Sequence, residues 1–238
     1  MNSRLVNIYR FLLERYGKQG WWPLIQHRRQ NPLVKESDRG YHPENYDLPS
    51  CHDEIYEICL GAILTQNTGW TQVEVALNNL FQLNNLKPDL MQKAEIEVIK
   101  EAIKPAGYFN QKAKKIKIFT EYFVGLGLGC DKIPTRDELL SIWGVGPETA
   151  DSMLLYAFKV PTFVVDAYTM RIFTNLNFIR ENATYNEVKR LFEENLPKDL
   201  VIYQEYHALI VEHSKRFYRR GSDYRNCPIY QKRIKDEI

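Results

Sequence analysis

Two short features of the chain, a glycine pair and a single acid, could do chemistry together. The glycines lie in Gly144-Val145-Gly146, between two apolar runs of helical periodicity, and Asp166 follows twenty residues after Gly146. A tight glycine turn between helices exposes backbone N–H groups that bind anions such as phosphates. A carboxylate beside a bound phosphate backbone could stabilise positive charge or activate water. This spacing predicts an enzyme that holds a nucleic acid and uses one acid; the alternative is a plain turn followed by an aspartate that caps the helix expected over 167–176.

The segments that must position these residues have helical periodicity almost throughout. Apolar side chains recur at helical spacing in several stretches, for example Ile55, Cys59, Ala62 and Ile63, or Ile96, Ile99 and Ile103. Thr135 with Glu138 and Thr184 with Glu187 have the spacing of capping boxes, which open helices. Pro147 suits the first turn of the helix that follows the glycines. No convincing alternating strand pattern appears, so we predict an all-α fold.

The distribution of prolines and glycines predicts two helical lobes. Residues 28–50 form the longest irregular stretch, and a second break falls at Lys159-Val160-Pro161. We expect one lobe over residues 51–160, containing a helix–hairpin–helix at about 136–158, and a second lobe formed by residues 1–50 together with 161–238. The active site would lie in a cleft between these lobes, where we place Asp166.

Composition is that of an ordinary soluble protein. The chain has 238 residues, 44% hydrophobic and 26% charged, with a net charge of +2. Lysines cluster at 112–117 and basic residues at 215–225, and such patches can hold phosphates, although solvated helix faces are the alternative. No apolar run reaches the roughly 18 residues of a membrane span. We therefore expect a cytoplasmic, nucleoid-associated monomer that does not act at a membrane.

The four cysteines do not predict a metal site. Cys51, Cys59, Cys130 and Cys227 are widely scattered, and no pair has the spacing of a zinc knuckle. We expect free thiols and no metal ligands among them.

At this point several segments resemble one known family. LLSIWGVGPETADSMLLYAF followed by VVDAYTMR resembles the helix–hairpin–helix and catalytic-aspartate motif of the endonuclease III superfamily of DNA glycosylases. GAILTQNTGW, AGYFNQKAKKI and HALIVEHSKRFY resemble further segments of that family, so the resemblance extends from about residue 51 to the end. It implies a base-excision-repair DNA glycosylase that acts on double-stranded DNA holding a damaged base, with Asp166 as the catalytic aspartate.

The resemblance also implies which residues contact DNA. Gln66 corresponds to a residue that wedges into the duplex when the damaged base leaves the stack, and Asn67 beside it could contact the opposite strand. The hairpin contacts would come from Gly144, Val145, Gly146 and Thr149, with Lys112 as a further DNA contact. For Gln66 the alternative is a polar end of the helix expected over 53–66.

Two departures from the family pattern refine the expected chemistry. Bifunctional members carry a lysine two positions after the last hairpin glycine, where this chain has Glu148, so we expect no Schiff base and little or no lyase activity. Many members end in four cysteines that hold an iron–sulfur cluster. Aligned on Cys227, the other three ligand positions hold Phe217, Tyr224 and Arg233, so we expect no cluster. The sequence does not decide whether a monovalent cation binds the carbonyl oxygens of the hairpin, as one does in relatives.

The expected base pocket is aromatic. Trp22-Pro23 near the N-terminus and Trp70 after the TQNT segment resemble the 3-methyladenine branch of the family. An aromatic pocket would attract cationic alkylated purines by cation–π contact. The alternative is that the paired tryptophans are core residues, since tryptophan is highly buried on average. The leading prediction is a glycosylase for alkylated purines; the alternatives are a glycosylase for uracil, mismatched thymine or another deaminated or oxidised base, and, remotely, a non-catalytic DNA-binding protein.

Overall fold

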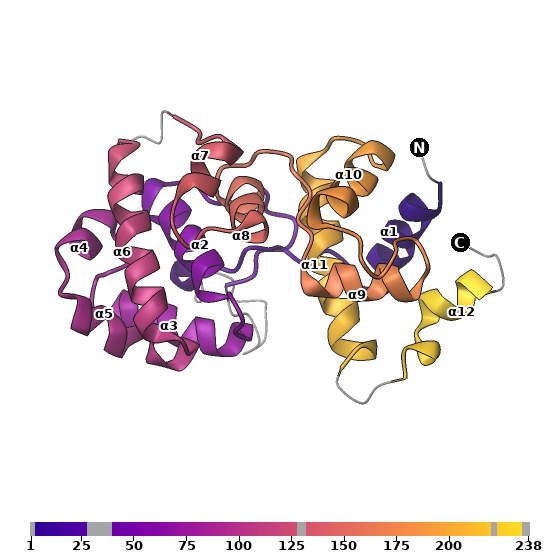
Figure 1. Cartoon of the computed structure of the whole chain (residues 1–238), viewed down its shortest axis with the longest axis horizontal. Helices are drawn as coiled ribbons and strands as arrows, with labels where there is room; N and C mark the ends of the chain where they lie inside the picture. Colours follow the sequence, from indigo (N-terminus) through magenta and orange to yellow (C-terminus); the bar gives the residue numbers. More distant parts are fainter. Residues whose placement is uncertain (1–2, 28–39, 128–131, 220–222, 235–238) are drawn as a thin grey trace. The chain divides into compact units, whose positions relative to one another are not determined.

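Helices are the regular secondary structure of the part of the chain that the structure describes, and turns and loops join them. The computed structural model describes residues 3–27, 40–127, 132–219 and 223–234, and no strand occurs among them (Figure 1). The predicted all-α fold is confirmed. None of the described helices is both long and apolar enough to span a bilayer. The chain divides into two compact units, Trp22–Lys159 and the pair of chain ends Met1–Trp21 and Val160–Ile238.

The central unit, Trp22–Lys159, is built around helix α2, whose residues from Tyr56 to Leu64 are all buried. Helix α6 packs on α2, α4 and α5, and it buries Ile116, Phe119 and Phe123 on one face. The elements of this unit are η1 (Ile25–His27), α2 (His52–Leu64), α3 (Trp70–Gln82), α4 (Pro88–Lys93), α5 (Ile96–Ile103), η2 (Lys104–Ala106), α6 (Phe109–Gly125), α7 (Arg136–Ser141), α8 (Pro147–Ser152) and the π-helical turn η3 (Met153–Ala157).

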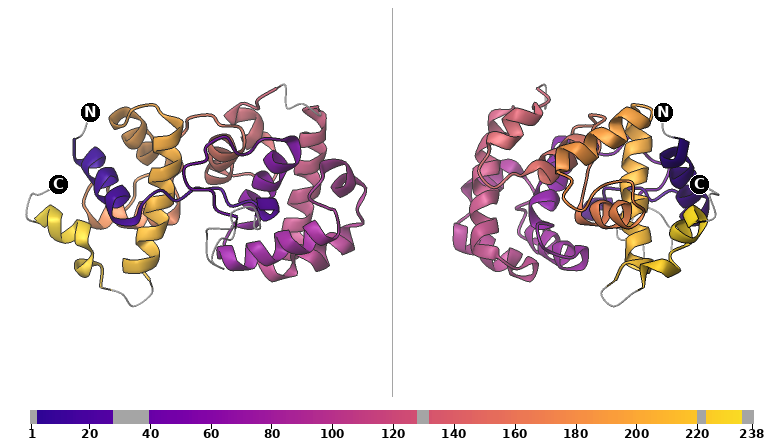
Figure 2. Two further views of the ribbon diagram at one scale, coloured as in Figure 1. Left: turned by 180° about the vertical axis from the view of Figure 1, so that it is seen from behind. Right: turned by 45° about the vertical axis from the view of Figure 1, so that its right-hand side comes forward.

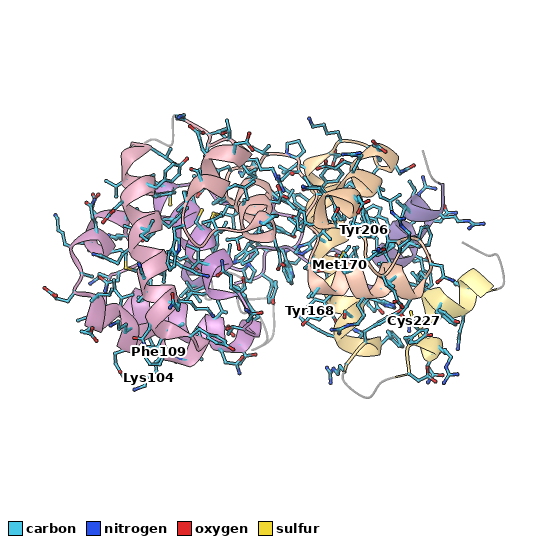
Figure 3. The ribbon with its side chains drawn as sticks, in the orientation of Figure 1. Lys104, Phe109, Tyr168, Met170, Tyr206 and Cys227 are labelled. Carbon is cyan, nitrogen blue, oxygen red and sulfur yellow. The ribbon has the colours of Figure 1, made fainter. Side chains whose placement is uncertain are left out.

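The unit formed by the chain ends is centred on α11, which packs against α1 and α9 (Figure 2). Tyr206 of α11, labelled in Figure 3, is fully buried among the rings of Phe163, Phe173 and Phe192. Burying each such ring stabilises the fold by about 1.5–3 kcal/mol. The elements are α1 (Ser3–Tyr16), α9 (Ala167–Asn175), α10 (Tyr185–Asn195), α11 (Leu200–Phe217), η4 (Tyr224–Asn226) and α12 (Pro228–Ile234).

The two predicted capping boxes are confirmed. The Thr135 side chain accepts from the N–H of Glu138, and the Glu138 carboxylate accepts from the N–H of Thr135. Thr184 and Glu187 make the same reciprocal pair at the start of α10. Each box satisfies N–H groups that the first turn of a helix cannot pair within itself.

The predicted lobe boundaries differ from the observed units at residues 22–50, which the sequence grouped with the chain ends. The Ile25 N–H donates to Glu57 Oε1 of α2 at 2.5 Å, and Leu24 N–H donates to Gly40 O at 3.0 Å. A Cβ on Gly40, whose φ is +84°, would lie 2.1 Å from Leu24 O. These contacts attach the described part of the segment to the central unit. Most of the irregular stretch itself, residues 28–39, lies outside the described residues.

Candidate functional site

Asp166 begins α9 as its N-cap. Its backbone is extended, and Oδ1 accepts hydrogen bonds from Thr169 N at 2.7 Å and from Thr169 Oγ1 at 2.8 Å. The residue is only 8% exposed. Asp166 therefore does cap the helix, which was one of the two roles its position predicts. The cap uses Oδ1, and Oδ2 stays outside it.

The second oxygen of Asp166 faces a histidine that sequence reasoning missed. Oδ2 lies 3.7 Å from Nε2 of His207 on α11, and both side chains are buried. The Trp21 ring stands edge-on to the His207 ring, at 5.7 Å between centroids. Although HALIVEHSKRFY begins at His207, nothing in the sequence links that residue to an acid forty-one positions earlier.

These neighbours keep Asp166 ionised. Burial acts to raise the pKa of Asp166, but the adjacent His207 and the two Thr169 donors stabilise the carboxylate and outweigh it, so the pKa lies below its usual value. A buried carboxylate that stays charged at neutral pH is suited to stabilising a developing positive charge.

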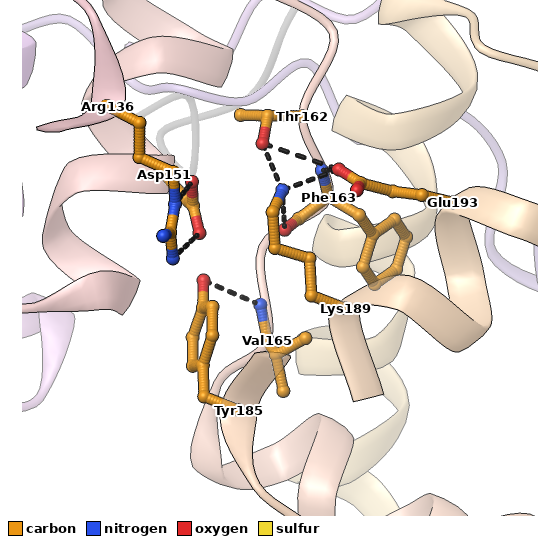
Figure 4. Close-up of polar contacts among 8 residues, drawn as sticks. All are labelled: Arg136, Asp151, Thr162, Phe163, Val165, Tyr185, Lys189 and Glu193. Atoms are coloured by element: carbon orange, nitrogen blue, oxygen red, sulfur yellow. Dashed lines mark hydrogen bonds and ion pairs between the residues drawn. The ribbon is translucent and has the colours of Figure 1, made fainter. Parts of the chain in front are cut away.

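The segment that leads into Asp166 is held by side chains of α10 in place of a neighbouring strand (Figure 4). Phe163 N–H donates to Glu193 Oε1 at 2.9 Å, and Phe163 O accepts from Lys189 Nζ at 3.3 Å. Val165 N–H donates to the Tyr185 hydroxyl at 3.4 Å. Since Lys189 and Glu193 also pair with each other at 2.5 Å, this clamp fixes the backbone directly before Asp166.

The predicted hairpin joins α7 to α8. Gly144 has φ +90°, which strongly favours glycine, whereas Gly146 has φ −96° and is the N-cap of α8. A Cβ on Gly144 would lie 2.5 Å from Lys115 Cγ, while one on Gly146 would meet nothing within 4 Å. The positive φ and the close Lys115 side chain therefore both favour glycine at position 144, and neither applies at position 146.

An ion pair with a fully buried carboxylate ties the two hairpin helices together. Arg136 of α7 donates from Nε to Asp151 Oδ1 at 2.9 Å and from NH2 to Asp151 Oδ2 at 3.1 Å, as Figure 4 shows. The Asp151 side chain is fully buried. Such a two-point contact fixes orientation as well as charge.

Gln66 reaches the hairpin although it lies 78 residues before Gly144. Its Nε2 donates to Gly144 O at 2.9 Å and to Thr149 Oγ1 at 3.0 Å, and its Oε1 accepts from Lys115 Nζ at 2.5 Å. Asn67 beside it is exposed, with φ +54°. The structure thus brings together the predicted DNA contacts Gln66, Gly144 and Thr149. Val145 is buried with 7% exposure, so its side chain is part of the packing.

Lys112 does not have the surroundings of a phosphate contact. It is 2% exposed, and its Nζ donates to Leu64 O, Ala106 O and Thr68 Oγ1 at 2.8, 2.8 and 2.6 Å. Burial, with the nearby Lys115 charge, lowers the pKa of Lys112 to about 8. Lys112 is therefore an internal tie in this structure, and its DNA contact stays a prediction. Its exposed neighbour Lys114 instead lies over the Trp143 ring, 4.7 Å from the centroid.

The residues predicted to line a base pocket are packed in the central unit. Trp22 is 5% exposed and stands edge-on to Trp70 at 5.5 Å and to Tyr156 at 5.3 Å. Pro23 is also buried, and Trp70 is half-buried. A Cβ on Gly61 of α2 would lie 2.8 Å from Trp22 Nε1. In this structure Trp22 therefore packs as a core residue, which is the alternative to a pocket wall.

Comparison with known proteins decides the family. Residues 60–198, more than half of the chain, match the HhH-GPD superfamily base excision DNA repair protein family. The chain is 44% identical to "Putative DNA repair glycosylase MJ1434" of Methanocaldococcus jannaschii, over 94% of this chain and 93% of that protein. The chain belongs to the HhH-GPD superfamily. It is accordingly a DNA glycosylase of base excision repair.

Further relatives agree with this assignment. The chain is 29% identical to Endonuclease III of Sulfolobus acidocaldarius over 68% of this chain and 73% of that protein. A structure of the Helicobacter pylori 3-methyladenine DNA glycosylase MagIII bound to 1,N6-ethenoadenine matches with a TM-score of 0.61 and 27% identity, over 71% of this chain and 87% of that one. A non-covalent Endonuclease III–DNA complex shares the fold, with a TM-score of 0.73 at 18% identity and coverage of 100% and 98%.

Three of the four positions at which many relatives ligate an iron–sulfur cluster hold other side chains here, and the fourth holds Cys227. Cys227 is buried, and its Sγ lies 3.0 Å from His213 Nε2, while the Phe217 ring packs 4.9 Å from the His213 ring. Tyr224, at another ligand position, stacks edge-on with Tyr230. Within the described residues no three His, Cys, Asp or Glu side chains gather as a metal site. One thiol with aromatic neighbours does not fit a cluster that needs four thiolates.

Proposed function

We propose that this DNA glycosylase hydrolyses the N-glycosidic bond of a damaged nucleotide in double-stranded DNA with Asp166 as its catalytic carboxylate. The supporting observation is the buried Asp166 carboxylate, whose Oδ1 caps α9 while Oδ2 stays outside the cap, and whose pKa lies below its usual value. As the bond to the base breaks, its electron pair leaves with the base and positive charge grows on the sugar, which Asp166 stabilises. Water oxygen then bonds to the sugar carbon, and the water proton passes to Asp166 Oδ2.

The test is Asp166→Asn, since asparagine also caps helices and leaves the fold intact. Single-turnover base release should fall by about 100-fold or more, while duplex affinity stays within about twofold. Asp199→Asn is the matched control, because Asp199 caps α11 in the same way, accepting from Ile202 N at 2.9 Å. Base release that persists in Asp166→Asn would overturn the assignment.

We further propose that the reaction is hydrolytic, without strand cleavage. Support comes from Glu148, which occupies the first turn of α8 where bifunctional relatives carry a lysine. A glutamate cannot form the Schiff base that precedes strand cleavage. Borohydride should trap no covalent complex with the natural chain, and Glu148→Lys should introduce a trapped adduct. A strong adduct with the natural chain would contradict this proposal.

Alkylated purines are the substrate class that we propose first. The support is the 27% identity to the Helicobacter pylori enzyme, which was solved with 1,N6-ethenoadenine, together with the half-buried ring of Trp70, which packs against Trp22. A cationic base is attracted by aromatic faces and leaves easily, so it needs little help from hydrogen bonds.

A second candidate, a uracil, mismatched thymine or other deaminated or oxidised base, is favoured by one observation. Trp22 and Trp70 stand at 84° with centroids 5.5 Å apart, an arrangement without a face-to-face slot for a base. A panel of duplexes, each with one lesion, separates the candidates. Release of 3-methyladenine or 1,N6-ethenoadenine supports the first, and release of uracil or thymine opposite guanine supports the second.

We also infer that the chain holds no iron–sulfur cluster and works as a monomer. The donor set around Cys227 supports the first part, because a single thiol lies where four are needed. Protein purified without oxygen should lack iron and the visible absorbance of a cluster. Stoichiometric iron with acid-labile sulfide would contradict this inference.

A further inference from the structure

We propose that His207 is a positioning residue for Asp166, which faces Oδ2 from α11 and holds the carboxylate in its orientation during base release. This inference rests on the proposed catalytic role of Asp166. It adds a residue from α11, a helix that carries no part of the aspartate or hairpin motifs.

The two carboxylate oxygens of Asp166 have different surroundings. Oδ1 accepts two hydrogen bonds from Thr169 and is held by the helix cap. Oδ2 lies 3.7 Å from His207 Nε2, which is within ion-pair range but longer than a hydrogen bond. His207 can therefore influence the charge on Oδ2 without occupying it, which leaves that oxygen for the sugar or a water molecule.

His207 is fixed in place by contacts made two residues earlier on α11. Glu205 accepts the N–H groups of Gln19 at 2.7 Å and Gly20 at 3.3 Å. These bonds hold the backbone that carries Trp21, whose ring stands edge-on to the His207 ring. Lys215 Nζ lies 5.8 Å from the centroid of the same indole. Side chains of α11 thus hold the Trp21 segment that packs against His207.

The groups that face α11 identify the partner of His207. Helix α1 presents Tyr9 to Tyr206 and Tyr16 to His213, and Arg15 lies beside Tyr16 and Phe217. Helix α9 presents Asp166 to His207 and Arg171 to Tyr218 O. The segment before Trp21 engages Glu205 through its backbone. Among these described groups, Asp166 is the acid at ion-pair distance from His207.

The direction of the effect follows from charge. Burial favours protonation of the Asp166 carboxylate, whereas the neighbouring His207 opposes it. Removing the imidazole leaves burial less opposed, so the pKa of Asp166 rises. As the pH falls, the Asp166 carboxylate of this variant would then become protonated at a higher pH than in the natural chain.

The test compares His207→Gln with His213→Gln in single-turnover base release across pH. Both are buried histidines on α11, but His213 pairs with Tyr16 at 2.8 Å and does not contact Asp166. We expect His207→Gln to move the acidic limb up by about one pH unit, which is about a tenfold slower reaction on that limb. His213→Gln should leave the limb in place. An unmoved limb in folded His207→Gln overturns the inference.

A spectroscopic readout separates this inference from the proposed function. Carbon-13 NMR of aspartate carboxyls, assigned with Asp166→Asn, follows the ionisation of Asp166 without substrate. Its midpoint should rise in His207→Gln and stay constant in His213→Gln. A raised midpoint without base release from any lesion would support the role of His207 beside Asp166 and refute the proposed function. An unchanged midpoint with normal base release would support the proposed function and refute the role of His207. If His207→Gln does not fold, Trp21→Leu, which removes the confining ring, should shift the midpoint in the same direction, and no shift would refute the proposal.

Discussion

The hairpin of the central unit and the acid site of the chain-end unit hold their functional groups in different ways. At the hairpin, the backbone itself is specialised, because Gly144 has φ +90° and lies against Lys115. At the acid site, ordinary backbone is held by distant side chains, with Glu193 and Lys189 on the segment before Asp166 and His207 beside its carboxylate. The hairpin is thus sensitive to added atoms, and the acid site to lost charges.

The largest expected effect concerns the ion pair inside the hairpin, where a lost charge should also matter. Arg136→Met leaves the fully buried Asp151 carboxylate without its two-point partner. The free energy of unfolding should fall by about 3–5 kcal/mol, measured by urea denaturation. Lys132→Met is the control, since Lys132 pairs with Glu138 at the surface, and it should cost less than about 1 kcal/mol. Equal losses would show that the buried pair is not special.

The second prediction tests the sensitivity of the hairpin to added atoms. Gly144→Ala forces a side chain into a positive-φ position against Lys115, so stability should fall by about 1–3 kcal/mol and DNA affinity with it. Gly146→Ala adds the same methyl where φ is −96° and space is open, and it should be nearly neutral. Denaturation and a duplex-binding assay measure both. A neutral Gly144→Ala would remove the distinction between the two glycines.

This contrast explains what could be predicted from sequence. The hairpin, both capping boxes and the aspartate lie in short local patterns, so the sequence reveals them and the all-α fold. His207 and the α10 clamp act on residues twenty or more positions away, which no local pattern encodes. The burial of Lys112 could not be predicted, because lysine side chains usually face solvent, whereas three oxygen acceptors hold this ammonium inside the unit. The role of Trp22 depends on packing that residue types cannot decide.

The third prediction uses pH to test the chain-end unit. Burial, with the charges of Arg15 and Arg216, lowers the pKa of His213 from 6.5 to about 3. Between these values the unfolded chain binds a proton that the folded chain does not, so stability falls as the pH drops from about 6.5 towards 3. This histidine should contribute up to about 1.4 kcal/mol per pH unit to the fall. His213→Gln should flatten the slope in acid denaturation; an unchanged slope would place the proton elsewhere.

The smallest expected effect concerns DNA affinity. Lys115→Met removes a half-buried charge from beside the hairpin and Gln66. The salt dependence of duplex binding should lose about one counterion, measured as the slope of log affinity against log salt. Lys117→Met is the control, because Lys117 donates to Gln92 O and Ala94 O at the end of α4. The same slope change in both variants would assign no special place to Lys115.

The closeness of Gly61 to Trp22 has a consequence for how this chain can change. A glycine inside a helix lowers helix propensity by about 1 kcal/mol relative to alanine, yet here its bare face receives an indole at 2.8 Å from the missing Cβ. The sizes of the two side chains are therefore coupled: a methyl at position 61 is tolerated only with a smaller ring or none at position 22. Any effort to reshape this aromatic group should alter the two positions as a pair.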